Sequence, residues 1–97
     1  MTVCRKNDNG VLTIAIEGRI DTLTAPKLEP ELGLDGAKEL VLDFAGVEYI
    51  SSAGLRLLVR TYKAVTTAGG TLKLANVRPI VKEVFEITGF DDRFTFV

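Results

Sequence analysis

The segment from Leu40 to Val65 constrains the fold more than any other part of this 97-residue chain. It begins with a nearly continuous apolar run, and Glu39–Ala45 is therefore predicted to be a strand in the middle of a sheet. A tight loop with the adjacent serines Ser51 and Ser52 follows, and a helix is then predicted up to the Gly69-Gly70 stop. A buried strand leading directly into an amphipathic helix is typical of an α/β protein. The helix positions expected to face inward are Leu55, Leu58, Val59 and Tyr62, and those expected to face solvent are Arg56, Arg60, Lys63 and Thr67.

The other predicted elements extend this α/β pattern over the chain. Residues 3–6 and 12–17 form a hairpin across a turn, and 71–75 and 94–97 are further strands. A loop is expected over Gly18–Thr24, with Thr24 capping a helix that is short or kinked at Pro30. A third helix begins at Pro79. The order β-β-α-β-α-β-α-β predicts one domain over residues 1–97, with a mixed β-sheet and α-helices mainly on one face.

Composition excludes several classes of function. The net charge of −1 lacks the basic excess of nucleic-acid-binding proteins, and no apolar run approaches the ~20 residues of a membrane span. The first residues lack the apolar region of a secretion signal, which favours a cytoplasmic location. The absence of histidine removes Ser-His-Asp catalysis and the commonest zinc ligand. Cys4 is the only cysteine, so it forms no internal disulfide. Because free cysteine is commonly buried, we expect Cys4 to act as a small apolar residue in the first strand.

The two serines before the central helix have two interpretations. A helix N-terminus offers unpaired N–H groups and a favourable dipole, so a serine there is a candidate for reversible phosphorylation. Serine is also a preferred N-cap residue, and most serines at this position only cap the helix. The residues alone leave both interpretations open for Ser51 and Ser52.

Charged residues near the serines also have two interpretations. Asp43 is predicted to end the central strand and Glu48 to lie in the following loop, where a metal-ligand or acid–base role competes with simple hydrogen bonding. No second carboxylate stands at metal-ligand spacing, which favours hydrogen bonding. The stripe of Arg56, Arg60 and Lys63 is either a solvated face or part of a protein-binding patch. Lys63 is rejected as a base for a serine nucleophile, because it lies roughly 16 Å along the helix.

Over nearly its whole length the chain resembles STAS domains, in particular the stand-alone bacterial anti-sigma factor antagonists. That family typically reads D-x-x-x-x-x-[MI]-D-S-[ST]-G-L before an amphipathic helix. Here Asp43 is followed, after Phe44–Tyr49, by Ile50-Ser51-Ser52-Ala53-Gly54-Leu55. Aligned on Gly54, Ser52 takes the place of the family's phosphorylated serine, and Ser51 stands where the family has aspartate. Further matches are Gly18-Arg19-Ile20-Asp21, Thr24-Ala25, Gly69-Gly70, Val77-Arg78-Pro79, Val84-Phe85 and Thr88-Gly89-Phe90.

The resemblance implies a partner-switching regulator. The unmodified chain would bind an anti-sigma factor, itself a GHKL-type serine kinase, and so release a sigma factor. Phosphorylation of Ser52 would break the complex, and a serine phosphatase would restore it. In this scheme the chain is not an enzyme, needs no cofactor or metal, and is a monomer when free. The partner-binding residues would be Arg19, Asp21, Thr22, Ser51, Ser52, Gly54 and Arg56.

Two alternatives have a different function. The same fold could serve as a STAS-domain subunit of a transporter or stressosome-like complex, with no sigma-factor role. A small serine-dependent enzyme is the third hypothesis, and the lack of histidine and the short chain both disfavour it.

Overall fold

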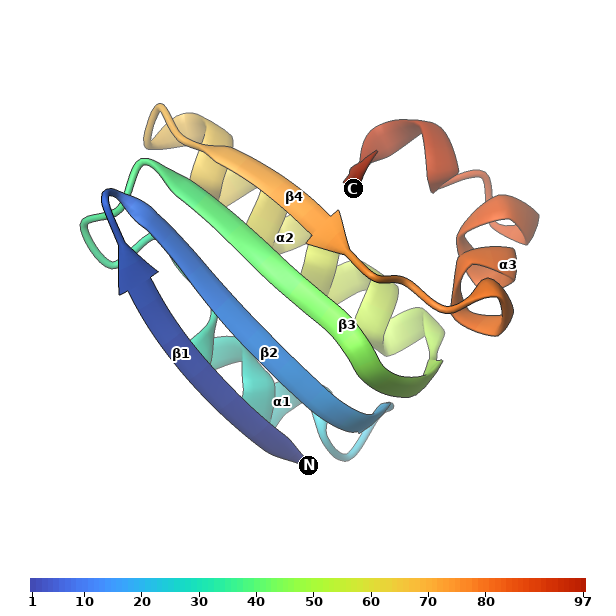
Figure 1. Cartoon of the computed structure of the whole chain (residues 1–97). Coiled ribbons are helices and arrows are strands. Elements are labelled where there is room, and N and C mark those ends of the chain that lie inside the picture. The colour runs from blue at the N-terminus through green and yellow to red at the C-terminus, as the bar shows by residue number, and fades with distance from the viewer.

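A computed structural model describes residues 1–97 as a five-stranded sheet covered by helices (Figure 1). β1 and β2 pair antiparallel across a turn in which Asn9 and Gly10 both have positive φ. The remaining strands are parallel, which confirms the predicted mixed sheet. In space the strands follow the order β1-β2-β3-β4-β5, which the sequence analysis did not specify. The strands are β1 (Thr2–Asp8), β2 (Val11–Ile20), β3 (Glu39–Ile50), β4 (Thr71–Ala75) and β5 (Thr95–Phe96).

The helices connect the parallel strands. Figure 1 shows α1 and α2 behind the sheet, with α3 beyond the end of β4. The first helix is short, as predicted: a 3-10 turn containing Pro30 replaces its continuation, because proline lacks the N–H that a longer helix would need. The helical segments are α1 (Ala25–Leu28), the 3-10 turn Glu29–Glu31, α2 (Ser52–Thr67), α3 (Pro79–Ile87) and the 3-10 turn Asp91–Arg93.

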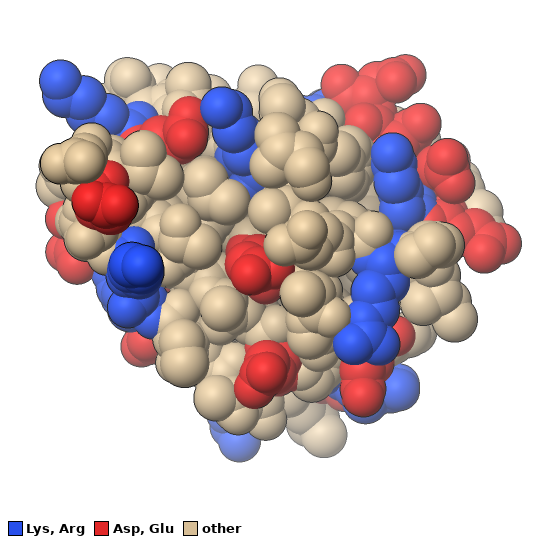
Figure 2. Space-filling view, viewed as in Figure 1, with Lys and Arg blue, Asp and Glu red and all other residues tan.

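One apolar core lies between the sheet and the helices. Ile14, Leu42 and Leu74 fill it from three neighbouring strands, and Leu58 and Phe85 close it from α2 and α3. Along β2, β3 and β4 the buried residues mostly fall at every second position, because successive side chains of a strand point to opposite faces. The opposite face carries no helix, and Figure 2 shows it as mainly uncharged with scattered acidic and basic groups.

β2 and β3 are longer than the sequence pattern predicts. The expected loop over Gly18–Thr24 is wrong in its first part, because β2 continues to Ile20. β3 likewise continues to Ile50, so Asp43 and Glu48 lie inside a strand rather than at its end and in a loop. The two strands remain paired beyond the end of β4, with irregularities after Ala15 and Gly18. Those irregularities break the strict alternation of apolar residues by which a strand is recognised in a sequence.

Two expectations about buried side chains are also wrong. Tyr62 is 39% exposed, and it packs edge-on against Phe94 at the margin of the core, with a centroid separation of 5.9 Å. Thr61 takes the inward position instead, since its hydroxyl donates to the Leu57 carbonyl and leaves no unpaired buried group. Cys4 is exposed, because it pairs with Ala15 on the sheet face that carries no helix. The face of α2 that is buried consists of Gly54, Leu55, Leu57, Leu58, Thr61 and Val65.

Candidate partner-binding site at the serine loop

The two serines have different positions at the start of α2. Ser51 is the N-cap, with extended backbone angles, and its Oγ accepts a hydrogen bond of 3.3 Å from the Gly54 N–H. Ser52 is the first residue of the helix and is exposed. The N–H groups of Ser52 and Ala53 have no carbonyl one turn earlier within the helix to accept them. Ser51 therefore performs the capping, while Ser52 presents its hydroxyl to solvent beside a favourable position for an anion.

The loop after β2 lies next to the serines because β2 and β3 are parallel neighbours. Arg19 pairs in register with Tyr49, and Ile20 with Ile50. The Ser51 N–H donates to the Ile20 carbonyl at 2.8 Å and extends this pairing by one residue. The structure therefore places Arg19 and Asp21, two of the predicted partner-binding residues, beside the serine loop.

Asp21 organises the turn that follows β2. Its Oδ1 accepts hydrogen bonds of 3.0 Å from the N–H groups of Leu23 and Thr24. The Thr24 hydroxyl donates to the Arg19 carbonyl at 2.7 Å and accepts from the Asp21 N–H at 2.9 Å. Thr24 thus stands at the N-cap of α1 but makes no side-chain cap bond, contrary to expectation, because its oxygen is already engaged. Thr22 is exposed on the same turn.

These contacts change the acidity of Asp21. The Thr24 N–H, followed by the Leu23 N–H, the Thr24 hydroxyl and the Arg19 charge, holds the pKa of Asp21 below its ordinary value despite partial desolvation. A lowered pKa means that the folded state favours the carboxylate form. The resulting stabilisation is present above the unfolded pKa of about 3.9 and is lost as pH falls through the folded value.

We expect Asp21→Asn to lower the melting temperature near neutral pH and to differ progressively less from the wild type in acid. Thermal unfolding of both proteins from pH 7 to pH 2 measures this convergence. Asp92→Asn is the control, because Asp92 is exposed and makes no hydrogen bond or ion pair. A difference between wild type and Asp21→Asn that stays constant down to pH 2 would contradict the prediction.

Gly54 contributes to the site through packing. It is buried, and a Cβ at this position would lie 2.7 Å from Ile50 Cγ1 and 2.8 Å from Ile20 Cγ2. The Ile20 carbonyl oxygen would be 3.1 Å away. Glycine therefore allows the first turn of α2 to rest directly on the ends of β2 and β3. Gly54 therefore positions the serines and presents no exposed contact surface of its own.

Two arginines extend the exposed surface around Ser52. Arg56 lies one turn further along α2 on the same face, is exposed and forms no ion pair. The Arg19 guanidinium lies over the Tyr49 ring at 4.4 Å, and its Nε is 3.9 Å from Asp21 Oδ2. Arg60 differs, because it binds both carboxylate oxygens of Glu29, at 3.0 and 3.3 Å. The predicted basic stripe is thus partly neutralised, and Arg56 is its free charge nearest to Ser52.

Asp43 has a structural role. Its Oδ1 accepts from the Ala45 N–H at 3.0 Å and from Asn76 Nδ2 at 3.1 Å, and so ties β3 to the residue that follows β4. No group of three or more histidine, cysteine, aspartate or glutamate side chains is arranged to hold a metal ion. The hydrogen-bonded interpretation of Asp43 therefore agrees with the structure.

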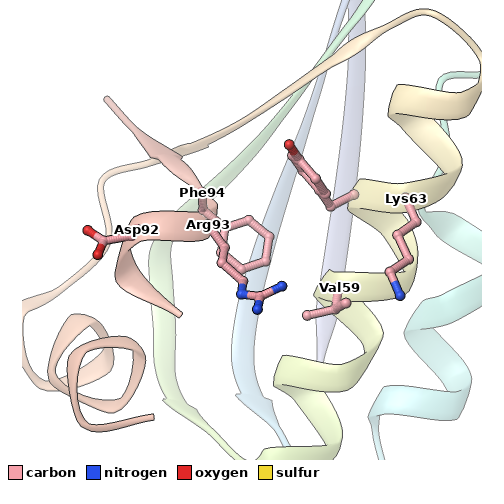
Figure 3. Close-up of a pocket in the computed structure, with 6 residues that line it drawn as sticks. Val59, Lys63, Asp92, Arg93 and Phe94 are labelled. Atoms are coloured by element: carbon pink, nitrogen blue, oxygen red, sulfur yellow. The ribbon is translucent and has the colours of Figure 1, made fainter. Parts of the chain in front are cut away.

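None of the three hollows of the molecule exceeds about 310 Å³. One of about 230 Å³ lies between α2 and the chain after α3; Figure 3 shows Arg93 extending toward Val59, and Asp92 pointing away. Lys63 lines this hollow, eleven positions after Ser52 and far from the serines. Sites for small molecules usually measure about 300–1,000 Å³. Ser52 itself lines none of the hollows, and its exposed position is suited to contact with a protein partner.

Sequence reasoning did not include Tyr49 in this site. Its ring supports Arg19, and its place is set by the register of β2 against β3. The signal that could have identified it is the expectation that neighbouring parallel strands end side by side, applied to strands of the correct length.

Comparisons with known proteins identify the family. The sequence model of the STAS domain matches residues 4–97. The chain is 39% identical over 85 residues to BtrV of Bordetella bronchiseptica, provisionally named an anti-sigma factor antagonist, covering 84% of this chain and 73% of BtrV. It is 34% identical to an anti-sigma-B factor antagonist of Bacillus subtilis, covering 91% and 82%. The crystal structure of an anti-sigma factor antagonist from Mycobacterium paratuberculosis superposes with a TM-score of 0.86 at 30% identity, covering 98% and 83%.

The fold and the serine loop define a small α/β binding domain whose exposed surface lies at one end of a mixed sheet. The chain belongs to the STAS domain family. Its helices are all too short or too polar to cross a bilayer.

Proposed function

We propose that this chain is an anti-sigma factor antagonist that binds an anti-sigma factor kinase and is released when Ser52 is phosphorylated. The observation that carries the proposal is the division of roles at the start of α2. Ser51 already satisfies the capping requirement, so Ser52 is exposed and free to accept a phosphate. The names of the relatives support the anti-sigma factor as partner. In this role the chain is a ligand and a substrate, with Arg19, Asp21, Thr22 and Arg56 around the acceptor.

The magnitudes favour a switch in binding rather than in folding. A phosphate adds about −1.5 to −2 charges. At the helix N-terminus the dipole stabilises such charges by about 0.3–1 kcal/mol, so the domain tolerates them. A like charge misplaced across an interface costs several kcal/mol, which is the larger effect. Phosphorylation should therefore dissociate the complex and leave the domain folded.

The test is reconstitution with purified components from the same organism. The unmodified chain should bind the anti-sigma factor and displace its sigma factor, while ATP should dissociate the complex and a serine phosphatase should restore it. Size-exclusion chromatography should show a monomer for the free chain, and cell fractionation should place it in the cytoplasm. Co-purification with a transporter subunit, together with no affinity for any anti-sigma factor, would contradict the proposal.

Arg56→Glu should weaken binding to the anti-sigma factor kinase by tenfold or more, because Arg56 lies one turn from Ser52 and has no internal partner. Its melting temperature should stay close to that of the wild type, since exposed substitutions usually change stability by within about 0.5 kcal/mol. Lys6→Glu makes the same charge change on β1, far along the sheet from the serines, and serves as the control. The affinities are measured by calorimetry. Equal affinities for Arg56→Glu and Lys6→Glu would show that Arg56 is not part of the partner-binding surface.

A further inference from the structure

An apolar groove lies beside the serine loop, between the end of β3 and helix α3. Its volume is about 310 Å³. Tyr49 and Ile50 form one wall, and α3 forms the other. Ile50 directly precedes the capping serine, and the Tyr49 ring also carries Arg19. Tyr49 thus contributes both to the groove and to the support of Arg19, at the end of β3 that leads into the serine loop. Its lining residues are Glu48, Tyr49, Ile50, Ile80, Glu83, Val84 and Ile87.

Helix α3 has more apolar surface than the core uses. Val81 and Phe85 are fully buried and anchor the helix. Ile80 and Ile87 form the ends of a second stripe and are 66% and 76% exposed. With Glu83 and Val84 they occupy positions i, i+3, i+4 and i+7, so they lie on one helix face. Of the seven large hydrophobic side chains exposed on this chain, three line this one groove.

The charges around the groove indicate what fits it. Glu48 and Glu83 line it, and neither forms an ion pair within the chain. A two-fold dimer centred on the groove would bring the same carboxylates together from both copies, which is unfavourable. A different protein with apolar side chains flanked by lysine or arginine would satisfy both the apolar surface and the charge.

We propose that the groove between β3 and α3 is a second contact surface for the anti-sigma factor kinase, receiving a pair of apolar side chains flanked by a basic residue. The inference rests on the proposed function and adds a contact away from Ser52. The serine loop supplies the element that phosphorylation switches, and the groove supplies apolar area that anchors the partner. Because a few well-packed, fully desolvated side chains carry most of the binding energy at an interface, a filled groove that includes Tyr49 should contribute strongly to affinity.

The experiment measures the affinity of full-length variants for the purified anti-sigma factor kinase by calorimetry. Ile80→Ser combined with Ile87→Ser should weaken binding at least tenfold, and Glu83→Lys at least fivefold, with the latter loss shrinking at high salt. Glu86→Lys is the matched charge control, since Glu86 is exposed on the same helix but outside the groove. Val97→Ser is the apolar control, because Val97 is 64% exposed elsewhere. Both controls should stay within twofold of the wild type.

The outcomes separate this inference from the proposed function. If the wild type binds the kinase but the groove variants match their controls, the groove proposal is overturned and the proposed function stands. If the wild type fails to bind any anti-sigma factor, both fall. If sedimentation shows a wild-type dimer that is lost in the double isoleucine variant, the groove binds a second copy of this chain, and the proposal is wrong. Glu83→Lys alters an exposed position, so its result holds even if the double variant folds poorly.

Discussion

Ser52→Ala should incorporate no phosphate and should remain bound to the anti-sigma factor kinase in the presence of ATP. The reason is local: Ser52 is the exposed hydroxyl at the start of α2, whereas Ser51 is engaged in capping. The expected loss of phosphate transfer is complete, because position 52 then has no hydroxyl and the neighbouring Ser51 hydroxyl is engaged in the helix cap. Phosphopeptide mapping after incubation with kinase and ATP measures the site, and complex dissociation measures the switch.

Ser51→Ala is the matched control for this prediction. It should still accept phosphate at Ser52, while losing roughly 1 kcal/mol of stability with the helix cap. Ser52→Asp should stay folded and bind poorly, although one carboxylate carries less charge than a phosphate and mimics it only in part. Phosphate on Ser51 alone, or on neither serine with an active kinase, would refute the assignment and favour a STAS function unrelated to sigma factors.

Gly54→Ala should destabilise the domain by about 1–3 kcal/mol, the range typical of overpacking. The added methyl group would contact Ile50 and Ile20 at distances that carbon atoms do not adopt, and it would push α2 away from the sheet. For a domain of this size each kcal/mol lowers the melting temperature by roughly 4–8 °C. Thermal unfolding monitored by circular dichroism measures the shift.

Gly33→Ala provides the comparison for Gly54→Ala. A Cβ at Gly33 would meet no atom within 4 Å, so its stability should change by less than about 0.5 kcal/mol. Because the same helix displacement moves the serine loop, Gly54→Ala should also weaken partner binding. An unchanged melting temperature for Gly54→Ala would show that the close packing of α2 on β2 and β3 does not contribute to stability.

Much of the fold follows from the periodicity of apolar residues. The hairpin, the parallel strands and the helix after the serines were all predicted, since each shows a clear period of 2 or 3.6. The ends of β2 and β3 were not, because irregular pairing after Ala15 and Gly18 interrupts the alternation. Tyr62 was placed inside from its spacing alone, whereas its contact with Phe94 depends on a segment 32 residues away that spacing does not reveal.

The site was predictable in its position but only partly in its chemistry. The motif located both serines, and the strand order explains why Arg19 and Asp21 lie beside them. The residue types do not distinguish the roles of Ser51 and Ser52; only the hydrogen bond from the Gly54 N–H to Ser51 Oγ shows which serine caps the helix. The hydrogen bonds that engage Thr24 and lower the pKa of Asp21 depend on the conformation of one turn, which residue types alone do not specify.

The short β5 strand has a consequence for how the two proposed contacts would behave. Two residue pairs join β5 to β4, and Val97 adds backbone hydrogen bonds to Leu74 and Asn76. Beyond this short pairing, side chains hold the segment, with Phe85 packed edge-on against Phe94 and Phe96. The serine loop instead rests on β2 and β3, whose pairing runs over most of their length. Regions with few backbone hydrogen bonds open at lower free energy than central strands. We therefore expect the α3 wall of the groove to adjust to a partner's side chains more readily than the proposed phosphate acceptor Ser52, which lies next to the long pairing of β2 with β3.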